Sequence, residues 1–222
     1  MNTILLTGRQ VVFTMLYFGC NLLWDECYRM EYLNSARKVQ LKQGFEVYGF
    51  SVFSDRVCMV TGKFGEYTEK DACYDQLMVL NHFLKHGDLS DFDLRQYEKS
   101  SGPRTECRIL DSADDIRKTV IYIHLLAQDL GYIRIGTRYW WSSYQTYCRR
   151  YSWNIVDTAY VLDSISSDRD HAQRVFARQH GQAGKLGNPK PPCLNICNKF
   201  EKCFLIQLQC QMTNSGNDGM IV

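Results

Sequence analysis

The stretch of sequence that decides the fold is FEVYGFSVFSDRVCMVTG, residues 45–62. Its β-branched and aromatic residues predict two strand segments, arranged as a hairpin or as one bent strand. Successive side chains of a strand point to opposite faces, so Arg56 and Cys58 are expected to share a face. Two polar, chemically active side chains on one face raise the question of whether they form an active centre or belong to an ordinary strand.

Composition sets broad limits on the answer. The chain has 222 residues, of which 45% are hydrophobic and 23% charged, and this is typical of a globular protein with a sizeable core. A net charge of +2 means that a nucleic-acid binder would have to concentrate its basic residues locally. The ten cysteines include no CxxC pair, which indicates reduced thiols and a cytoplasmic location. No apolar run is long enough to predict a membrane span.

Helical periodicity predicts three long helices, at Leu22–Gln43, Glu69–His86 and Asp111–Asp129. The first is expected to end at Gly44 and to bury a stripe of apolar residues, which are Leu23, Cys27, Met30, Leu33 and Leu41. The segment KSSGPRTE, residues 99–106, is expected to be a loop because Ser, Gly and Pro are typical of turns.

Strands separated by helices predict an α+β fold, a ferredoxin-like antiparallel sheet with helices on one face plus a small helical C-terminal segment. The predicted organisation is an α+β domain at 1–150, a helical segment at 151–180, and a linker with a poorly ordered tail at 181–222.

Two segments carry a family resemblance. They are TVIYIHLLAQDLGYIRIGTRYWWSSYQTY, residues 119–147, and IVDTAYVLDSISSDRDHAQRVF, residues 155–176. They resemble the YIH, YxWSSY and VDTxFVL motifs of the REP-associated tyrosine transposases, which belong to the single-tyrosine HUH superfamily. The matching residues are Tyr122, Ile123, His124, Gly131, Tyr139, Trp141, Ser142, Ser143, Tyr144, Asp157, Thr158, Val161, Leu162, Asp168, Arg169, Ala172 and Phe176.

The resemblance implies a defined chemistry. In the family, a His-hydrophobe-His pair on a central strand holds a divalent metal, and a tyrosine attacks a phosphate of single-stranded DNA. Alignment of the strand places Arg56 and Cys58 at the two His positions. Arginine offers only hydrogen-bond donors, and a cysteine favours softer metals than magnesium. Tyr97 is the nearest candidate nucleophile, since no tyrosine lies between Gly102 and Cys107.

Basic residues interleaved with aromatic ones indicate where DNA would bind, because arginines contact phosphates and rings stack on unpaired bases. The candidate DNA-binding residues are Arg9, Arg56, Arg138, Tyr139, Trp140, Arg149 and Arg150. By contrast, Arg169, Arg174 and Arg178 are expected to form a solvated helix face.

Three functions follow as hypotheses. The first is a transposase-like protein that binds single-stranded or hairpin DNA and has lost strand cleavage, with no cofactor. The second is an active nuclease or transposase that uses Tyr97 and Mg or Mn. The third is an interaction module that does not bind DNA. In each case a monomer or homodimer without a membrane partner is expected.

Overall fold

The structure is a computed structural model that describes residues 8–89, 102–135, 137–148, 151–186 and 195–196. The first half of the chain forms β1 (Arg9–Tyr17), α1 (Glu26–Gln43), β2 (Glu46–Val52), β3 (Arg56–Phe64) and α2 (Glu69–His86). The second half forms β4 (Arg104–Leu110), α4 (Ala113–Asp129), α5 (Tyr144–Tyr147), α6 (Ala159–Asp163), α7 (Arg169–Leu186) and the two-residue β5 (Asn195–Ile196).

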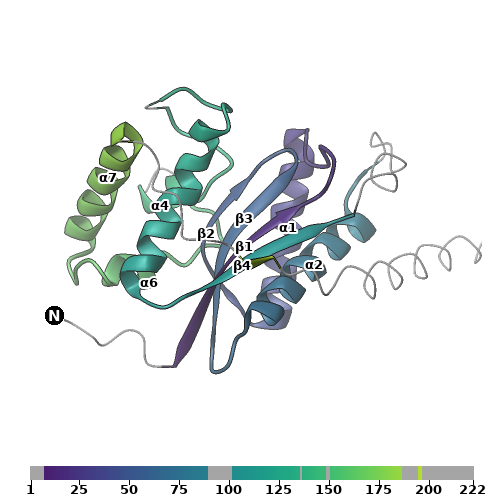
Figure 1. Cartoon of the computed structure of the whole chain (residues 1–222), viewed down its shortest axis with the longest axis horizontal. Helices are drawn as coiled ribbons and strands as arrows, with labels where there is room; N and C mark the ends of the chain where they lie inside the picture. The colour runs from purple at the N-terminus through teal and green to yellow at the C-terminus, as the bar shows by residue number, and fades with distance from the viewer. Residues whose placement is uncertain (1–7, 90–101, 136, 149–150, 187–194, 197–222) are drawn as a thin grey trace, which may run out of the picture.

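The strands form one antiparallel sheet in the order β2-β3-β1-β4-β5 (Figure 1). The element order β1-α1-β2-β3-α2-β4 with this strand order is the ferredoxin-like arrangement, so the predicted α+β class is confirmed. The hairpin predicted from residues 45–62 is β2 and β3, in which Val52 pairs with Val57.

Local sequence signals explain where the helices begin and end. The Asp25 side chain accepts a hydrogen bond from the backbone N–H of Cys27 and caps α1. Gly44 ends α1 with φ of 74°, a left-handed conformation that favours glycine. Thr68 and Asp71 form a capping box at the start of α2.

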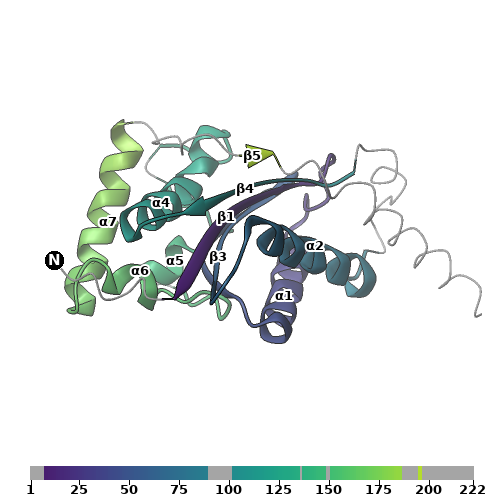
Figure 2. The same ribbon diagram turned by 60° about the horizontal axis from the view of Figure 1, so that its bottom comes forward.

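Helices cover both faces of the sheet. Figure 2 shows α1 and α2 on one side and α4 to α7 on the other. Between α1 and α2, the rings of Tyr32 and Phe83 meet edge to face with centroids 5.7 Å apart. On the opposite side, Phe13 of β1 meets Tyr122 of α4 at 6.4 Å.

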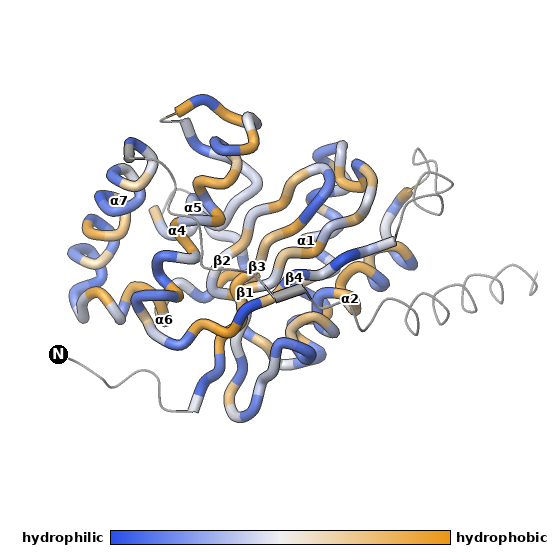
Figure 3. Tube along the Cα trace, viewed as in Figure 1, coloured by the Kyte–Doolittle hydropathy of each residue, from blue (hydrophilic) through white to orange (hydrophobic). Residues whose placement is uncertain are grey.

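Gly49 of β2 allows α4 to approach the sheet closely. A Cβ atom at this position would lie 3.1 Å from the methyl groups of Val120 and 3.3 Å from the Ile123 side chain. Ser51, two residues further along the same face, donates a hydrogen bond to the carbonyl oxygen of Ile123. Helix α4 and the face of the sheet beneath it therefore form a second layer of the hydrophobic core. Figure 3 shows much of β1 and β3 coloured as hydrophobic.

Three expectations about local structure are wrong, the second of them only in part. Residues 104–106, expected in a loop, begin β4. Thr105 and Cys107 are buried and alternate with polar residues that face the other side of the sheet, which is the pattern of a strand. The buried stripe of α1 agrees with the expected one only in part. Leu23 and Leu33 are buried as expected, whereas Cys27, Met30 and Leu41 are exposed, and Tyr28 and Tyr32 are buried in their place. Helix α7 continues to Leu186, beyond the expected start of the linker at 181.

Candidate functional site

The predicted pair on β3 lies on the face that α4 partly covers. Arg56 is the partner of Tyr17 in the β1–β3 ladder, and Cys58 is the partner of Met15. Partners in a ladder project to the same side of the sheet, and Tyr17 and Met15 are two residues apart on β1. Arg56 and Cys58 therefore share one face, as their spacing predicts.

Neither side chain fits the divalent metal that the family resemblance implies. The Arg56 guanidinium makes a forked ion pair with Asp55, with contacts of 2.6–3.1 Å, and these hydrogen bonds raise the pKa of Arg56 further. Cys58 is completely buried, and burial raises the pKa of its thiol, which disfavours the thiolate that would bind a metal. Within the described ranges, no three His, Cys, Asp or Glu side chains come close enough to hold a metal ion.

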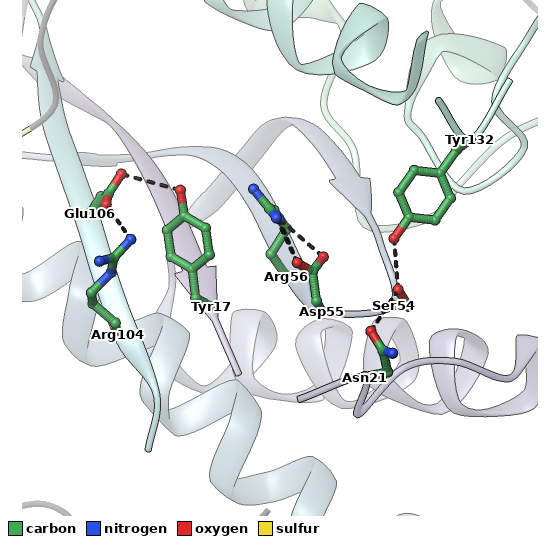
Figure 4. A network of polar contacts seen from close by, with 8 residues as sticks. All are labelled: Tyr17, Asn21, Ser54, Asp55, Arg56, Arg104, Glu106 and Tyr132. Atoms are coloured by element: carbon green, nitrogen blue, oxygen red, sulfur yellow. Dashed lines mark hydrogen bonds and ion pairs between the residues drawn. The ribbon is translucent and has the colours of Figure 1, made fainter. Parts of the chain in front are cut away.

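Instead, the ends of three adjacent strands form what we term the arginine–tyrosine cluster, consisting of Tyr17 of β1, Arg56 of β3 and Arg104 of β4. Figure 4 shows the Tyr17 ring between the two guanidinium groups. Their central carbons lie 4.9 Å (Arg56) and 4.7 Å (Arg104) from the ring centroid, which is within the range of a cation–π interaction. The arginine side chains are 24% and 48% exposed, so the cluster is open to solvent.

Two carboxylates hold the cluster in place. Glu106 accepts a hydrogen bond from the Tyr17 hydroxyl at 3.3 Å and pairs with Arg104 at 2.9 Å, while Asp55 holds Arg56. The two guanidinium charges are thus balanced by two carboxylates. The net charge of the cluster would therefore attract an anionic ligand only weakly. The planar guanidinium groups and the Tyr17 ring could still offer hydrogen bonds and stacking surfaces.

The tyrosines at this face are not activated nucleophiles. Burial, followed by the negative charge of Glu106, raises the pKa of Tyr17 above its ordinary value of 10.0. Burial likewise raises the pKa of Tyr122 to about 12. Both phenols therefore remain protonated at neutral pH. Tyr97, the candidate nucleophile expected from the sequence, lies outside the described residues.

A second row of polar contacts borders the cluster. The Ser54 hydroxyl lies 2.7 Å from the hydroxyl of Tyr132 and 3.3 Å from the side-chain oxygen of Asn21 (Figure 4). These contacts connect the β2–β3 turn to the loop after α4 and to the loop before α1. The turn that carries Asp55 is thereby held on both sides.

The YWWSSY segment mainly performs a structural role. Tyr139 stacks on Phe53 with ring centroids 5.3 Å apart and donates a hydrogen bond from its hydroxyl to the carbonyl oxygen of Val52. This buried ring has no free face for a base, so the geometry does not favour Tyr139 as a DNA contact. Trp140 is different, because it is 50% exposed and lies beside Tyr151, which is 40% exposed.

His124 and Ser143, two residues of the family-like motif, meet in the interior. The Nε2 atom of His124 lies 2.6 Å from the Ser143 hydroxyl, which also accepts a hydrogen bond from the backbone N–H of Phe50 at 2.9 Å. Burial lowers the pKa of His124 well below 6.5, so the imidazole is neutral. These residues fasten α4 and the segment before α5 to β2.

The remaining predicted contacts do not join the cluster. Arg9 pairs with Glu46 and lies over the Phe64 ring. It begins β1 whereas Tyr17 ends it, a separation of about 26 Å at the rise of a strand. Arg138 lies 5.8 Å over the ring of Tyr144, the first residue of α5. Arg149 and Arg150 fall outside the described residues.

Tyr17 and Arg104 were not among the site residues predicted from the sequence. The signal available for Arg104 was the alternation in RTECRIL, residues 104–110, where Arg104, Glu106 and Arg108 occupy every second position. No local signal could have singled out Tyr17, because its importance depends on which strands lie beside β1.

Comparisons with known proteins add little to this geometry. No family model matches the chain. A search of curated proteins also finds no match. Among solved structures, the chain is similar to that of a REP-associated tyrosine transposase bound to a REP hairpin, with 14% sequence identity and a TM-score of 0.47. The superposition covers 68% of this chain and 87% of that chain, a distant likeness that carries no information about what this chain binds.

The hydropathy of the helices shows whether any of them could span a membrane. Among those that the structure describes, no helix is both long and apolar enough to cross a membrane.

Proposed function

We propose that this chain is a transposase-like protein that binds single-stranded or hairpin DNA on the open part of its sheet and does not cut it. The observation that carries the proposal is the arginine–tyrosine cluster, in which two partly exposed guanidinium groups flank Tyr17 on adjacent strands. Guanidinium groups bind phosphates and stack on unpaired bases, so this is a suitable surface for an unpaired strand.

The absence of cutting is proposed from the chemistry of the same face. Arg56 is a cation fixed by Asp55, and the buried Cys58 thiol is held in its neutral form. The phenols of Tyr17 and Tyr122 are also held protonated, so neither is prepared to attack a phosphate. Among the residues that the structure describes, this face offers guanidinium groups that can bind nucleic acid and no cluster of side chains that could hold a metal ion.

The test is fluorescence anisotropy with labelled single-stranded and hairpin DNA at several salt concentrations. We expect Arg56→Gln/Arg104→Gln to weaken binding by about tenfold or more, since hydrogen bonds to charged groups contribute about 1.5–3 kcal/mol each. If both arginines contact phosphates, the salt slope also falls by about 1.4, at about 0.7 per phosphate of a single strand.

Arg117→Gln/Lys118→Gln is the matched control, because it removes two positive charges that pair with Asp114 near the start of α4. We expect it to leave binding within about twofold of the wild type, since these charges are far from the cluster. Equal losses in the two double variants would mean that overall charge, and not the cluster, accounts for binding. No binding to any strand at low salt would refute the proposal and favour an interaction module.

A second experiment tests the absence of cleavage. Labelled single-stranded DNA is incubated with the protein and Mg²⁺ or Mn²⁺ and then analysed on a denaturing gel. We expect no covalent protein–DNA adduct. An adduct that disappears in Tyr97→Phe would show that the chain is an active transposase or nuclease.

A further inference from the structure

A separate pocket lies between α7 and the segment that precedes and includes α5, where the Tyr147 ring of α5 stacks on Phe176 of α7. Its volume is about 350 Å³, at the lower end of the range for small-molecule sites. The lining includes Arg138, Tyr144, Cys148, Asp170, Gln173 and Arg174. A pocket of this size suits one small ligand better than a length of duplex.

The pocket is positively charged. Arg138 and Arg174 both line it, and among the described residues neither makes an ion pair with a carboxylate. Arg9, Arg56, Arg104 and Arg108, by comparison, each have a carboxylate partner. Asp170 contributes one negative charge, which leaves an excess of one positive charge on the wall. Two like charges around a concavity favour an anionic ligand that would relieve their repulsion.

An aromatic surface lies beside the two cations. The ring of Tyr144 stacks on His180 with centroids 4.0 Å apart, and the Arg138 guanidinium lies 5.8 Å over the same ring. Burial, and secondarily the charge of Arg138, lower the pKa of His180 to about 4, so this imidazole adds no charge at neutral pH. The Gln173 amide supplies both a donor and an acceptor at the wall.

We infer that this pocket binds the terminal phosphate of a single DNA strand, with the phosphate between Arg138 and Arg174 and the attached nucleoside towards Gln173. A terminal phosphate monoester carries a charge of about −1.5 to −2 at pH 7, whereas an internal phosphodiester carries one negative charge. A monoester also offers three acceptor oxygens, one more than the non-bridging oxygens of an internal phosphodiester, so both arginines can form charge-assisted hydrogen bonds to it. The inference rests on the proposed function for its source of ligand, since a free mononucleotide offers the same chemistry.

The test uses the full-length chain and three oligonucleotides of one unpaired sequence, which carry a 5′-phosphate, a 3′-phosphate or no terminal phosphate. We expect one phosphorylated form to bind at least about tenfold tighter than the unphosphorylated form, because arginine–phosphate hydrogen bonds are charge-assisted. Arg138→Gln/Arg174→Gln should abolish that preference and leave binding of the unphosphorylated strand unchanged. Arg56→Gln/Arg104→Gln should weaken all three strands by the same factor.

Equal binding of the three strands by the wild type would overturn the inference, as would a preference that survives in Arg138→Gln/Arg174→Gln. Titration with deoxythymidine monophosphate separates this result from failure of the proposed function. If no strand binds, the wild type can still bind the mononucleotide. Loss of that binding in Arg138→Gln/Arg174→Gln would assign the pocket to a free nucleotide and exclude a DNA strand as the source of the phosphate. If neither the strands nor the mononucleotide bind, the pocket has no phosphate-binding role.

Discussion

Replacement of Ser143 by alanine tests the structural role of the family-like motif. The Ser143 hydroxyl is fully buried and contacts the backbone N–H of Phe50 at 2.9 Å and Nε2 of His124 at 2.6 Å. It also donates a longer hydrogen bond of 3.4 Å to the carbonyl oxygen of Phe50, which keeps a second donor in the backbone N–H of Ser143. Alanine leaves the Phe50 N–H and the His124 Nε2 without this partner, and a buried polar group without a partner costs about 1–3 kcal/mol. We therefore expect Ser143→Ala to lower the free energy of unfolding by about 3 kcal/mol.

Ser142→Ala is a close control, because the neighbouring hydroxyl is equally buried but makes a single hydrogen bond, to the carbonyl oxygen of Tyr139 at 2.8 Å. Its loss should cost about 1 kcal/mol, the net contribution of an ordinary hydrogen bond. The two substitutions remove the same atom from adjacent positions, so their difference reports the additional hydrogen bonds of Ser143.

Urea unfolding followed by circular dichroism measures both variants against the wild type at pH 7.5, where His124 is neutral in the folded and unfolded states. The slope of free energy against urea should be unchanged if the native state keeps its compactness. Equal losses in the two variants, or a loss below about 1 kcal/mol in Ser143→Ala, would refute the idea that Ser143 connects β2 to α4.

Two further predictions concern pH. The pKa of His180 is about 4 in the folded protein, whereas its ordinary value is 6.5. The neutral imidazole therefore contributes fully to the stability of the fold above pH 6.5. This contribution is lost below pH 6.5, where the unfolded chain takes up a proton. In urea unfolding, the wild type should therefore lose about 3 kcal/mol more than His180→Phe between pH 7 and pH 4, and equal losses would contradict this assignment. Burial raises the pKa of Asp75 to about 6, so stability is lost as pH rises from about 4 through 6. Asp75→Asn should gain about 2 kcal/mol relative to the wild type from pH 4 to pH 8, because Asp75 is buried and its carboxyl ionises later in the folded chain than in the unfolded chain. No gain would show that Asp75 titrates normally.

The motif that resembles the transposase family turns out to support the fold. His124, Ser143 and Tyr139 all have their polar atoms directed at β2 or at each other, and their side chains are buried. The proposed DNA contacts come from other positions, on the sheet face and beside α7. Resemblance in such a motif therefore informs about architecture more directly than about activity.

Local signals made several elements predictable. The hairpin of β2 and β3, helix α2 at Glu69–His86 and the end of α1 at Gly44 agree with the sequence-based prediction. Each depends on residues close together in the chain, such as the capping box of Thr68 and Asp71 or the left-handed conformation of Gly44. That Arg56 and Cys58, and no histidine, occupy alternate positions of this strand was likewise visible from the sequence alone.

Other features required the tertiary structure because they depend on distant neighbours. Helix α1 has apolar residues on more than one side, and only packing against the sheet selects Tyr28 and Tyr32 over Cys27 and Leu41. Strand β4 alternates polar with buried residues but lacks the apolar run that would reveal a strand, and its pairing with β1 defines it.

The candidate sites divide in the same way. From the sequence, Arg56 was a candidate DNA contact on a strand, and Arg174 was part of a solvated helix face. Strand pairing brings Arg56 beside Tyr17 and Arg104, and the packing of α7 brings Arg174 to the pocket that Arg138 also lines. The sequence by itself determined the helices, the hairpin and the absence of the histidine pair, since these depend on local chemistry. Only the tertiary structure decided which charges and rings meet, because those contacts join residues that are far apart along the chain.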